Sequence, residues 1–320
     1  MIVDLPDTTV SAISKQLVKL RDEGGVVALG RVLTLIIATD VESSDDAIQA
    51  ANSASREHPM RVIVIVSNGD DAHDGLDAEI RIGSDAGASE IIVLRAHGAV
   101  ADDEEGLVTG LLLSDAPTVV WWTGVAPTVP SQSPLGRIAQ RRITDASAQP
   151  NPASALRALS ESYVPGDTDF AWTRLTLWRG QLAAVLDQPP YEPVTAVSVH
   201  GSASSPSTLL LAAWLRMQLQ ADTEYALDPE EGEIGGIHGV VMTRASGQID
   251  LHRTSALIAS LTQPEQPDHD ISLPRRSLRD CLAEELRRLD PDEAFGAVIT
   301  RGLPQLVTAS ASASTLITGS

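Results

Sequence analysis

The stretch RVLTLIIATD, residues 31–40, decides the fold of the N-terminal part of this chain. It is an apolar run rich in β-forming residues, and it has the length of a buried strand. Ser44, followed by Asp45 and Asp46, begins a helix that would bury alanines against a sheet. RVIVIV, residues 61–66, is then a second buried strand. Strand, helix and strand at this spacing predict a parallel βαβ unit.

Elements on both sides of this unit complete an α/β domain with a mixed sheet, predicted at residues 1–122. Asp7 or Thr8 can cap a first helix whose apolar residues recur on one face. Trp121 and Trp122 end the last strand, and alternation along a strand predicts that one faces each side of the sheet. The other predicted elements are strands at 77–82, 90–95 and 116–122 and a helix at 105–113.

A Pro-rich and helical connecting segment is predicted at residues 123–190. It contains the stretch YVPGDTDFAWTRLTLWR, residues 163–179. Asp167 or Asp169 can cap a helix that runs to Asp187 and buries an apolar face including Trp178. Trp172 and Arg179, seven residues apart, lie together on an adjoining flank of that helix.

The C-terminal part, residues 191–305, is predicted to be an α+β domain with an antiparallel meander and terminal helices. Its short strands near 222–227, 239–244, 248–253 and 257–262 follow a strand and a helix. Ser277 and Asp280 form a capping box for the clearest helix of the chain. Residues 306–320, rich in Ser, Ala and Thr, are predicted to be a disordered tail.

Composition excludes several classes of function. The formal charge of −20 argues against nucleic acid and against an anionic membrane surface as partners. The two lysines, Lys15 and Lys19, leave no phosphate loop of the Gly-Lys-Ser/Thr kind. Cys281 is the single cysteine, so an internal disulfide and a cysteine-based zinc cluster are excluded. With no signal peptide and no membrane span in the sequence, a cytoplasmic protein is expected.

No catalytic, cofactor-binding or metal-binding residue is predicted, because none of the common signatures is present. Two weaker features each have two possible interpretations. Residues 83–90, GSDAGASE, are either an anion-binding nest of backbone amides or a flexible turn, and we favour the turn. Asp167 and Asp169 are either an acid/base pair or helix-capping groups, and we favour capping or support of a site.

Aromatic residues and arginines gather in the centre of the chain. Six of the ten aromatic residues lie between positions 121 and 178. These residue types are enriched where one protein anchors on another, so we expect the segment to bind a partner or to buttress the joint between two domains. The candidate partner-binding residues are Arg137, Arg141, Arg142, Trp172, Arg174 and Arg179.

An ordered set of stretches resembles a bacterial family, the OpcA family of glucose-6-phosphate dehydrogenase assembly proteins. The stretches include ALGRVLTLII, ASREHPMRVIV, DAPTVVWW, SPLGRIAQRRITDA, YVPGDTDFAWTRLTLWR and SLRDCLAEELRRLDPDEAF. The resemblance implies a non-enzymatic cytoplasmic protein that binds glucose-6-phosphate dehydrogenase, promotes its active oligomeric state as an allosteric activator, and supports NADPH supply in the oxidative pentose phosphate pathway. It supplies no site residues, and with Cys281 alone a redox link through an internal disulfide is not expected.

A second class of function is a phosphosugar-binding enzyme or metabolite sensor of central carbon metabolism. Its phosphate would be held by residues 83–89 and by arginines. Tight binding of phosphorylated sugars by the isolated protein would favour this class, and stimulation of the dehydrogenase would favour the assembly factor.

Overall fold

A computed structural model gives the structure of residues 1–24, 30–67, 73–82, 89–228 and 235–306. These are the described residues. The glycine-rich stretch at 83–88 and the predicted tail at 307–320 lie outside them, so neither prediction is tested. Leu306, the first residue of the predicted tail, is helical and buried.

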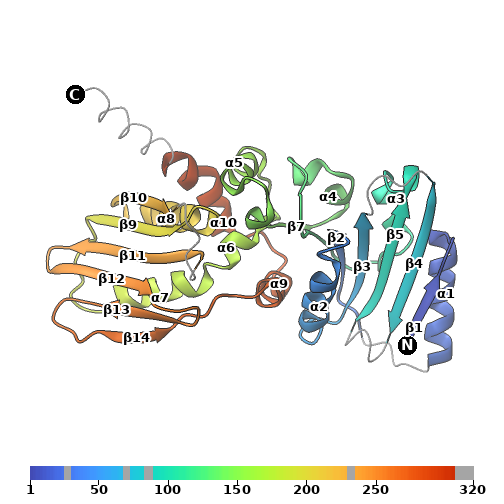
Figure 1. The fold of residues 1–320 in the computed structure, drawn as a ribbon, viewed down its shortest axis with the longest axis horizontal. Helices are drawn as coiled ribbons and strands as arrows, with labels where there is room; N and C mark the ends of the chain where they lie inside the picture. Colours follow the sequence, from blue (N-terminus) through green and yellow to red (C-terminus); the bar gives the residue numbers. More distant parts are fainter. Residues whose placement is uncertain (25–29, 68–72, 83–88, 229–234, 307–320) are drawn as a thin grey trace. The chain divides into compact units, whose positions relative to one another are not determined.

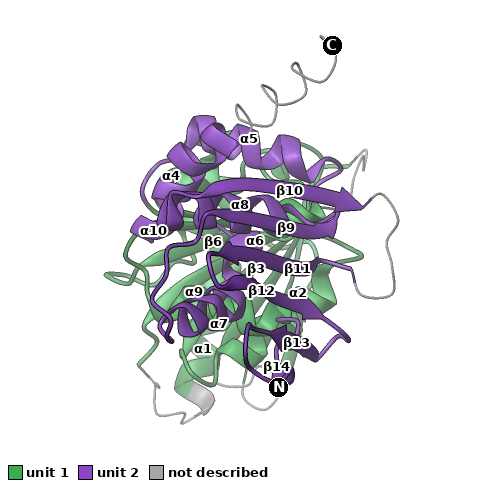
Figure 2. Ribbon diagram, turned by 90° about the vertical axis from the view of Figure 1, so that its left-hand side faces the viewer, with its two compact units in different colours: residues 1–148, 166–168, 277–291 green, residues 149–165, 169–276, 292–320 purple. Residues whose placement is uncertain are grey.

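The chain forms two compact units, which Figure 2 colours separately. Unit 1 comprises residues 1–148, 166–168 and 277–291, and unit 2 comprises residues 149–165, 169–276 and 292–320. The chain therefore passes from one unit to the other after residues 148, 165, 168, 276 and 291. The predicted domains, 1–122, 123–190 and 191–305, are a division along the sequence, and they stay a prediction.

Unit 1 is built on a mixed eight-stranded sheet in the order β1-β4-β5-β3-β2-β6-β7-β8 (Figure 1). The strands are β1 (Ile2–Leu5), β2 (Leu33–Asp40), β3 (Met60–Ser67), β4 (Gly75–Ile82), β5 (Glu90–His97), β6 (Thr118–Trp122), β7 (Arg141–Thr144) and β8 (Asp167–Asp169). Strands β2 and β3 pair in parallel around a helix that buries four alanines, which confirms the predicted βαβ unit. Strand β1 was not predicted; it pairs antiparallel with β4.

Unit 1 also contains α-helices and short 3-10 helices, which lie between its strands in the sequence or, for α9, after residues 169–276 of unit 2. They are α1 (Val10–Gly24), α2 (Ser44–Ala54), η2 (Gly98–Val100), α3 (Glu104–Thr109), η3 (Pro130–Gln132), α4 (Pro134–Ile138), η4 (Ala146–Ala148) and α9 (Leu278–Arg287). The capping box of Ser277 and Asp280 is confirmed at the start of α9. The predicted cap of α1 is wrong by one residue or two, because Thr9 Oγ1 accepts the N–H of Ala12 at 3.2 Å.

Both tryptophans of β6 are buried in unit 1. Trp122 belongs to the apolar core that also contains Ile13 and Leu17 of α1. Trp121 is 1% exposed and points to the opposite face, since successive side chains of a strand alternate. Cys281 is a fully buried thiol on α9, as expected from its place on the apolar face of that helix.

Unit 2 contains a six-stranded sheet in the order β10-β9-β11-β12-β13-β14. Its strands are β9 (Ala196–Ser202), β10 (Asp222–Asp228), β11 (Ile237–Arg244), β12 (Gly247–Arg253), β13 (Ile258–Thr262) and β14 (His269–Ser272). Strands β11, β12 and β13 form the predicted antiparallel meander, and β14, which was not predicted, extends it. The prediction is wrong for β10, which pairs with β9 in parallel because a helix connects the two strands as a crossover.

The helices of unit 2 are α5 (Pro152–Ser162), α6 (Phe170–Thr173), α7 (Thr176–Leu186), α8 (Pro206–Leu219), α10 (Glu293–Ala297) and the π-helix η5 (Val298–Gly302). The single helix predicted up to Asp187 is two helices, α6 and α7. Helix α10 begins after Asp292, which is its N-cap. Among the described residues, no helix has the length and apolar character needed to cross a membrane.

Candidate functional site

The stretch of residues 163–179 contains two of the passages of the chain between its units. Gly166 to Thr168 belong to unit 1, and the residues before and after them belong to unit 2. Gly166 has a φ of +101°, and a Cβ atom there would clash with the carbonyl oxygen of Gln140. A glycine is therefore required where the chain enters β8.

Asp169 is the N-cap of α6, because its Oδ1 accepts the N–H of Ala171 at 2.8 Å. Asp167 has a different role in unit 1. Its carboxylate pairs with Arg142, whose Nη1 also donates to the carbonyl oxygen of Ala139 at 2.7 Å. Both aspartates are 1% exposed. Each carboxylate is therefore engaged in holding backbone or an arginine, which differs from an acid/base pair open to a substrate.

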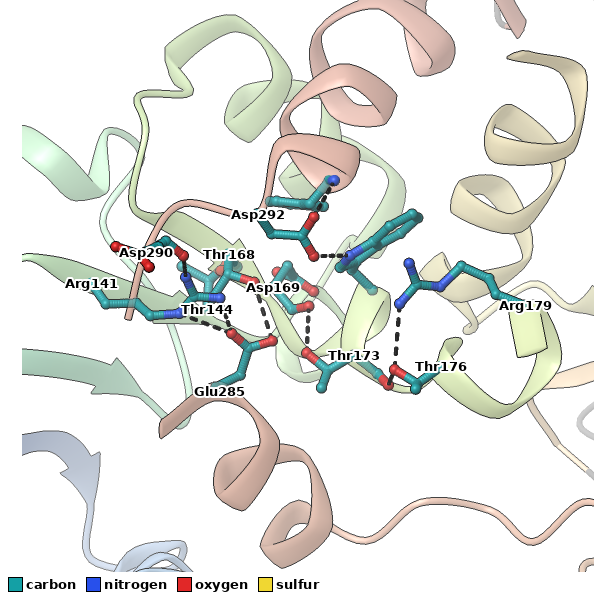
Figure 3. Close-up of polar contacts among 12 residues, drawn as sticks. Arg141, Thr144, Thr168, Asp169, Thr173, Thr176, Arg179, Glu285, Asp290 and Asp292 are labelled. Carbon is teal, nitrogen blue, oxygen red and sulfur yellow. Dashed lines mark hydrogen bonds and ion pairs between the residues drawn. The ribbon is translucent and has the colours of Figure 1, made fainter. Parts of the chain in front are cut away.

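Arg141 and Glu285 form a buried ion pair in unit 1. Together with their hydrogen-bond partners Thr168 and Asp290 they make up the Glu285 cluster (Figure 3). The guanidinium of Arg141 donates to Glu285 Oε2 from Nε at 3.0 Å and from Nη2, and its Nη1 donates to the carbonyl oxygen of Asp290 at 2.9 Å. Thr168 Oγ1 donates to Glu285 Oε1 at 3.3 Å. The side chains of Arg141 and Glu285 are each 5% exposed, so this charge pair is shielded from water.

Aromatic packing in unit 2 forms the Trp172 cluster, which comprises Tyr163, Trp172, Arg179, Asp292 and Phe295. The guanidinium of Arg179 lies 3.8 Å from the centroid of the Trp172 ring, the geometry of a cation–π contact. Trp172 Nε1 donates to Asp292 Oδ2 at 2.8 Å, while Asp292 Oδ1 caps α10 through the N–H of Phe295 (Figure 3). The ring of Phe295 contacts those of Trp172 and Tyr163, at centroid distances of 5.8 and 6.0 Å.

The two remaining candidate arginines lie apart from these clusters. Arg174 is half-buried, with its guanidinium 5.9 Å from the ring of Phe170 in unit 2. Arg137 lies on α4 of unit 1, where it pairs with Glu105 at 3.1 Å and donates to the carbonyl oxygen of Gln132. Its side chain is 57% exposed. Of the six candidates, Arg137 is thus the most accessible, whereas Arg141, Arg142 and Trp172 are buried.

Sequence reasoning missed the partners that complete the two clusters. Glu285 and Asp292 lie more than 100 residues from Arg141 and Trp172 in sequence, as does Arg276, which donates to the carbonyl oxygen of Thr173 at 2.8 Å. The residues around Asp292 give no indication of its bond to an indole.

The chemistry available in these clusters is that of structure and recognition. Buried arginine–carboxylate pairs fix the backbone around β7 and β8, and aromatic rings in edge-on and tilted contact fix α6 and α10. Among the described residues, no three or more His, Cys, Asp or Glu side chains are grouped so that they could hold a metal ion.

Comparison with family domains gives two matches that together span most of the chain. Residues 51–161 match the N-terminal domain of the family described as a glucose-6-phosphate dehydrogenase subunit. Residues 165–299 match the C-terminal domain of the same description. The second matched range begins inside the stretch of residues 163–179. No curated protein matches the chain at a significant level.

The solved structures that align with most of this chain include oxidoreductases. An oxidoreductase from Sinorhizobium meliloti has 11% identity and a TM-score of 0.49, with 88% of this chain and 98% of that chain covered. The myo-inositol dehydrogenase of Lactobacillus casei has 10% identity and a TM-score of 0.42, with 88% and 95% covered. At these values the likeness carries no argument about what the present chain does.

Proposed function

Because the chain belongs to the OpcA family of glucose-6-phosphate dehydrogenase assembly proteins, we propose that it binds this dehydrogenase and promotes its active oligomeric state without catalysing a reaction itself. The observation that carries the proposal is the pair of matched domains, which covers residues 51–161 and 165–299. The consequence is a greater supply of NADPH through the oxidative pentose phosphate pathway, in the cytoplasm.

The physical requirement for such an activator is a difference in affinity. It raises the population of the active oligomer only as far as it binds that form more tightly than the other forms. A tenfold preference corresponds to about 1.4 kcal/mol, which is on the order of one well-placed contact. A small set of residues on this chain is therefore sufficient for activation.

The accessible cations among the candidates are the residues we propose for direct contact with the enzyme. Arg137 is largely exposed, and Arg174 and Arg179 are half-buried. Arginine is enriched in protein interfaces because its planar fork bonds carboxylates and backbone carbonyls with defined geometry. Arg141, Arg142 and Trp172 then act as supports that hold the backbone and the neighbouring side chains in place, each within its own unit.

A role without catalysis is supported by the use of the two central aspartates. Asp167 is paired with Arg142, and Asp169 caps α6, so neither carboxylate is presented to a substrate. The alternative class, a phosphosugar-binding enzyme or sensor, relied on residues 83–89 for its phosphate site. All of those residues but Ser89 lie outside the described residues, so this alternative gains no support from them.

The experiment that tests the proposal is a titration of purified glucose-6-phosphate dehydrogenase with this protein, following NADPH formation by absorbance. We expect the rate to rise and to saturate at a fixed ratio of the two proteins, and the two proteins to elute together in gel filtration. The chain alone should form no NADPH from glucose 6-phosphate and NADP. Activity of the chain alone, or no change in the rate of the enzyme, would contradict the proposal.

Variants separate contact from support. Arg137→Gln should weaken activation with an unchanged melting temperature, and Arg56→Gln, at another exposed arginine of unit 1, should change neither. Trp172→Ala combined with Arg174→Ala should lower both activation and thermal stability, since Trp172 is buried against Phe295. If this double variant leaves folding and activation unchanged, neither Trp172 nor Arg174 has a part in binding.

A further inference from the structure

A pocket of about 380 Å³ opens in unit 2 at the C-terminal end of α8. Its polar lining comes from three places in unit 2. Arg216 and Gln220 lie at the end of α8, and Asp222 lies at the start of β10. Arg301 belongs to η5, and Gln305 belongs to the helical residues that follow η5. The pocket lies within one unit and involves none of the residues of the Glu285 and Trp172 clusters. Its volume falls within the range of about 300–1,000 Å³ that is usual for small-molecule sites.

The wall that carries Arg301 is a π-helix, a rare conformation that recurs at functional sites. Two features fix this helix within unit 2, a close approach to α8 at Gly302 and a hydrogen bond from Ser160 of α5. A Cβ atom at Gly302 would approach Met217 Sδ to 2.6 Å and the carbonyl oxygen of Ala213 to 3.2 Å, so the contact favours glycine. Ser160 Oγ also donates to the carbonyl oxygen of Ile299 at 2.6 Å. The position of Arg301 beside the end of α8 is therefore built into the packing of unit 2.

The charge of the pocket is unusual for this chain. The whole sequence carries a formal charge of −20, yet two guanidinium groups face a single carboxylate here. Within the described residues, the side chains of Arg216 and Arg301 form neither an ion pair nor a hydrogen bond, in contrast to Arg141 and Arg142. Two cations that line one pocket and pair with no other described residue leave room for an anion.

We propose that this pocket binds the phosphate ester of a small, hydroxyl-bearing metabolite, such as a phosphorylated sugar. A phosphomonoester carries nearly two negative charges at pH 7, because its second pKa is about 6, and it therefore matches two arginines better than a carboxylate does. Asp222 accepts hydrogen bonds from the hydroxyl groups of the ligand, and the amides of Gln220 and Gln305 donate and accept. The C-terminal carbonyls of α8 disfavour an anion at its last turn, and Arg216 lies there to offset them.

Isothermal titration of the purified chain tests this site without the dehydrogenase. Binding here adds a ligand to the proposed assembly factor when the chain also stimulates the dehydrogenase, and it favours the phosphosugar class when the chain does not. The probes are a hexose 6-phosphate, the same hexose without phosphate, and inorganic phosphate. We expect the hexose 6-phosphate to bind, the hexose to give no heat of binding, and inorganic phosphate to bind at least tenfold more weakly than the ester. Equal affinity for inorganic phosphate and the ester would overturn the assignment of a hydroxyl-bearing ligand.

Substitutions locate the binding to this pocket. Arg216→Gln and Arg301→Gln should each weaken binding of the hexose 6-phosphate by at least tenfold, and Arg301→Lys should weaken it less because the charge is kept. Arg157→Gln, at an exposed arginine on α5 of the same unit, is the matched control and should leave the affinity unchanged. Melting curves of each variant check that unit 2 stays folded. No binding of the ester, or equal binding by all variants, would overturn the proposal.

Discussion

Replacing Glu285 by glutamine tests whether the buried ion pair stabilises the backbone around β7 and β8. The change keeps the size of the side chain and removes the charge that faces Arg141, whose side chain is 5% exposed. Removal of one partner from a buried pair costs about 3–5 kcal/mol, because the remaining charge has lost both water and counter-ion. Glutamine still offers an oxygen to Thr168 and Arg141, so we expect a loss of about 3 kcal/mol in the free energy of unfolding.

The same helix supplies the matched control. Arg287, two residues further along α9, pairs with Glu57 at 3.1 Å, and these side chains are 64% and 54% exposed. An exposed pair contributes about 0–1 kcal/mol, so Arg287→Gln should shift the unfolding transition only slightly. Urea denaturation followed by circular dichroism and by tryptophan fluorescence measures both variants.

Two outcomes would refute this reasoning. The first is a loss for Glu285→Gln that is no larger than the loss for Arg287→Gln. The second concerns the double variant Arg141→Met with Glu285→Leu, which removes both buried charges and should recover much of the lost stability. A double variant that is less stable than Glu285→Gln would mean that the interactions of Arg141 outweigh the cost of burying its charge.

Further predictions concern glycines and one half-buried carboxylate, that of Glu104. Gly136→Ala should destabilise unit 1 by about 2 kcal/mol or more, since a Cβ atom there would overlap the carbonyl oxygen of Pro130. Gly180→Ala on α7, with open space around it, should instead stabilise the protein by up to about 1 kcal/mol. Thermal melts of the two variants measure the difference. Burial raises the pKa of the Glu104 carboxyl above its ordinary value, so the folded state binds the proton more tightly than the unfolded state does. The free energy of unfolding therefore falls as the pH rises from the ordinary pKa to the raised pKa of the folded state. Glu104→Gln should reduce this fall, measured by urea denaturation from about pH 4 to about pH 7, and an unchanged pH dependence would contradict the assignment.

Elements with a strong local pattern were predictable from the sequence. The apolar runs of β2 and β3, with an alanine-faced helix between them, have one stable arrangement, the parallel βαβ unit. The capping box before α9 likewise depends on residues three apart. Strand β1 is only four residues long and half-exposed, and it exists because β4 pairs with it, which no local pattern reveals.

The candidate site was predictable only in part, for the same reason. The closeness of Trp172 and Arg179 was predicted from their spacing on one helix. The 3.8 Å distance confirms the closeness, although the two residues lie on separate helices, α6 and α7. The burial of Trp172 was not foreseen, because it depends on Asp292 and Phe295 far along the chain. The sequence likewise predicts Arg141 as a partner-binding residue, because the carboxylate that pairs with it lies far along the chain. The charge of Arg141 is neutralised by Glu285, 144 residues away.

The mass distribution of glucose-6-phosphate dehydrogenase in solution is the measurement that decides whether this chain shifts the enzyme toward its active oligomer. Mass photometry at nanomolar concentration would compare the enzyme alone with the enzyme plus this protein, and the rate of NADPH formation would be recorded on the same samples. We expect a new species that contains both proteins, and an increase in rate that follows its population. An enzyme whose mass distribution and rate are unchanged at saturating amounts of this chain would contradict the proposal.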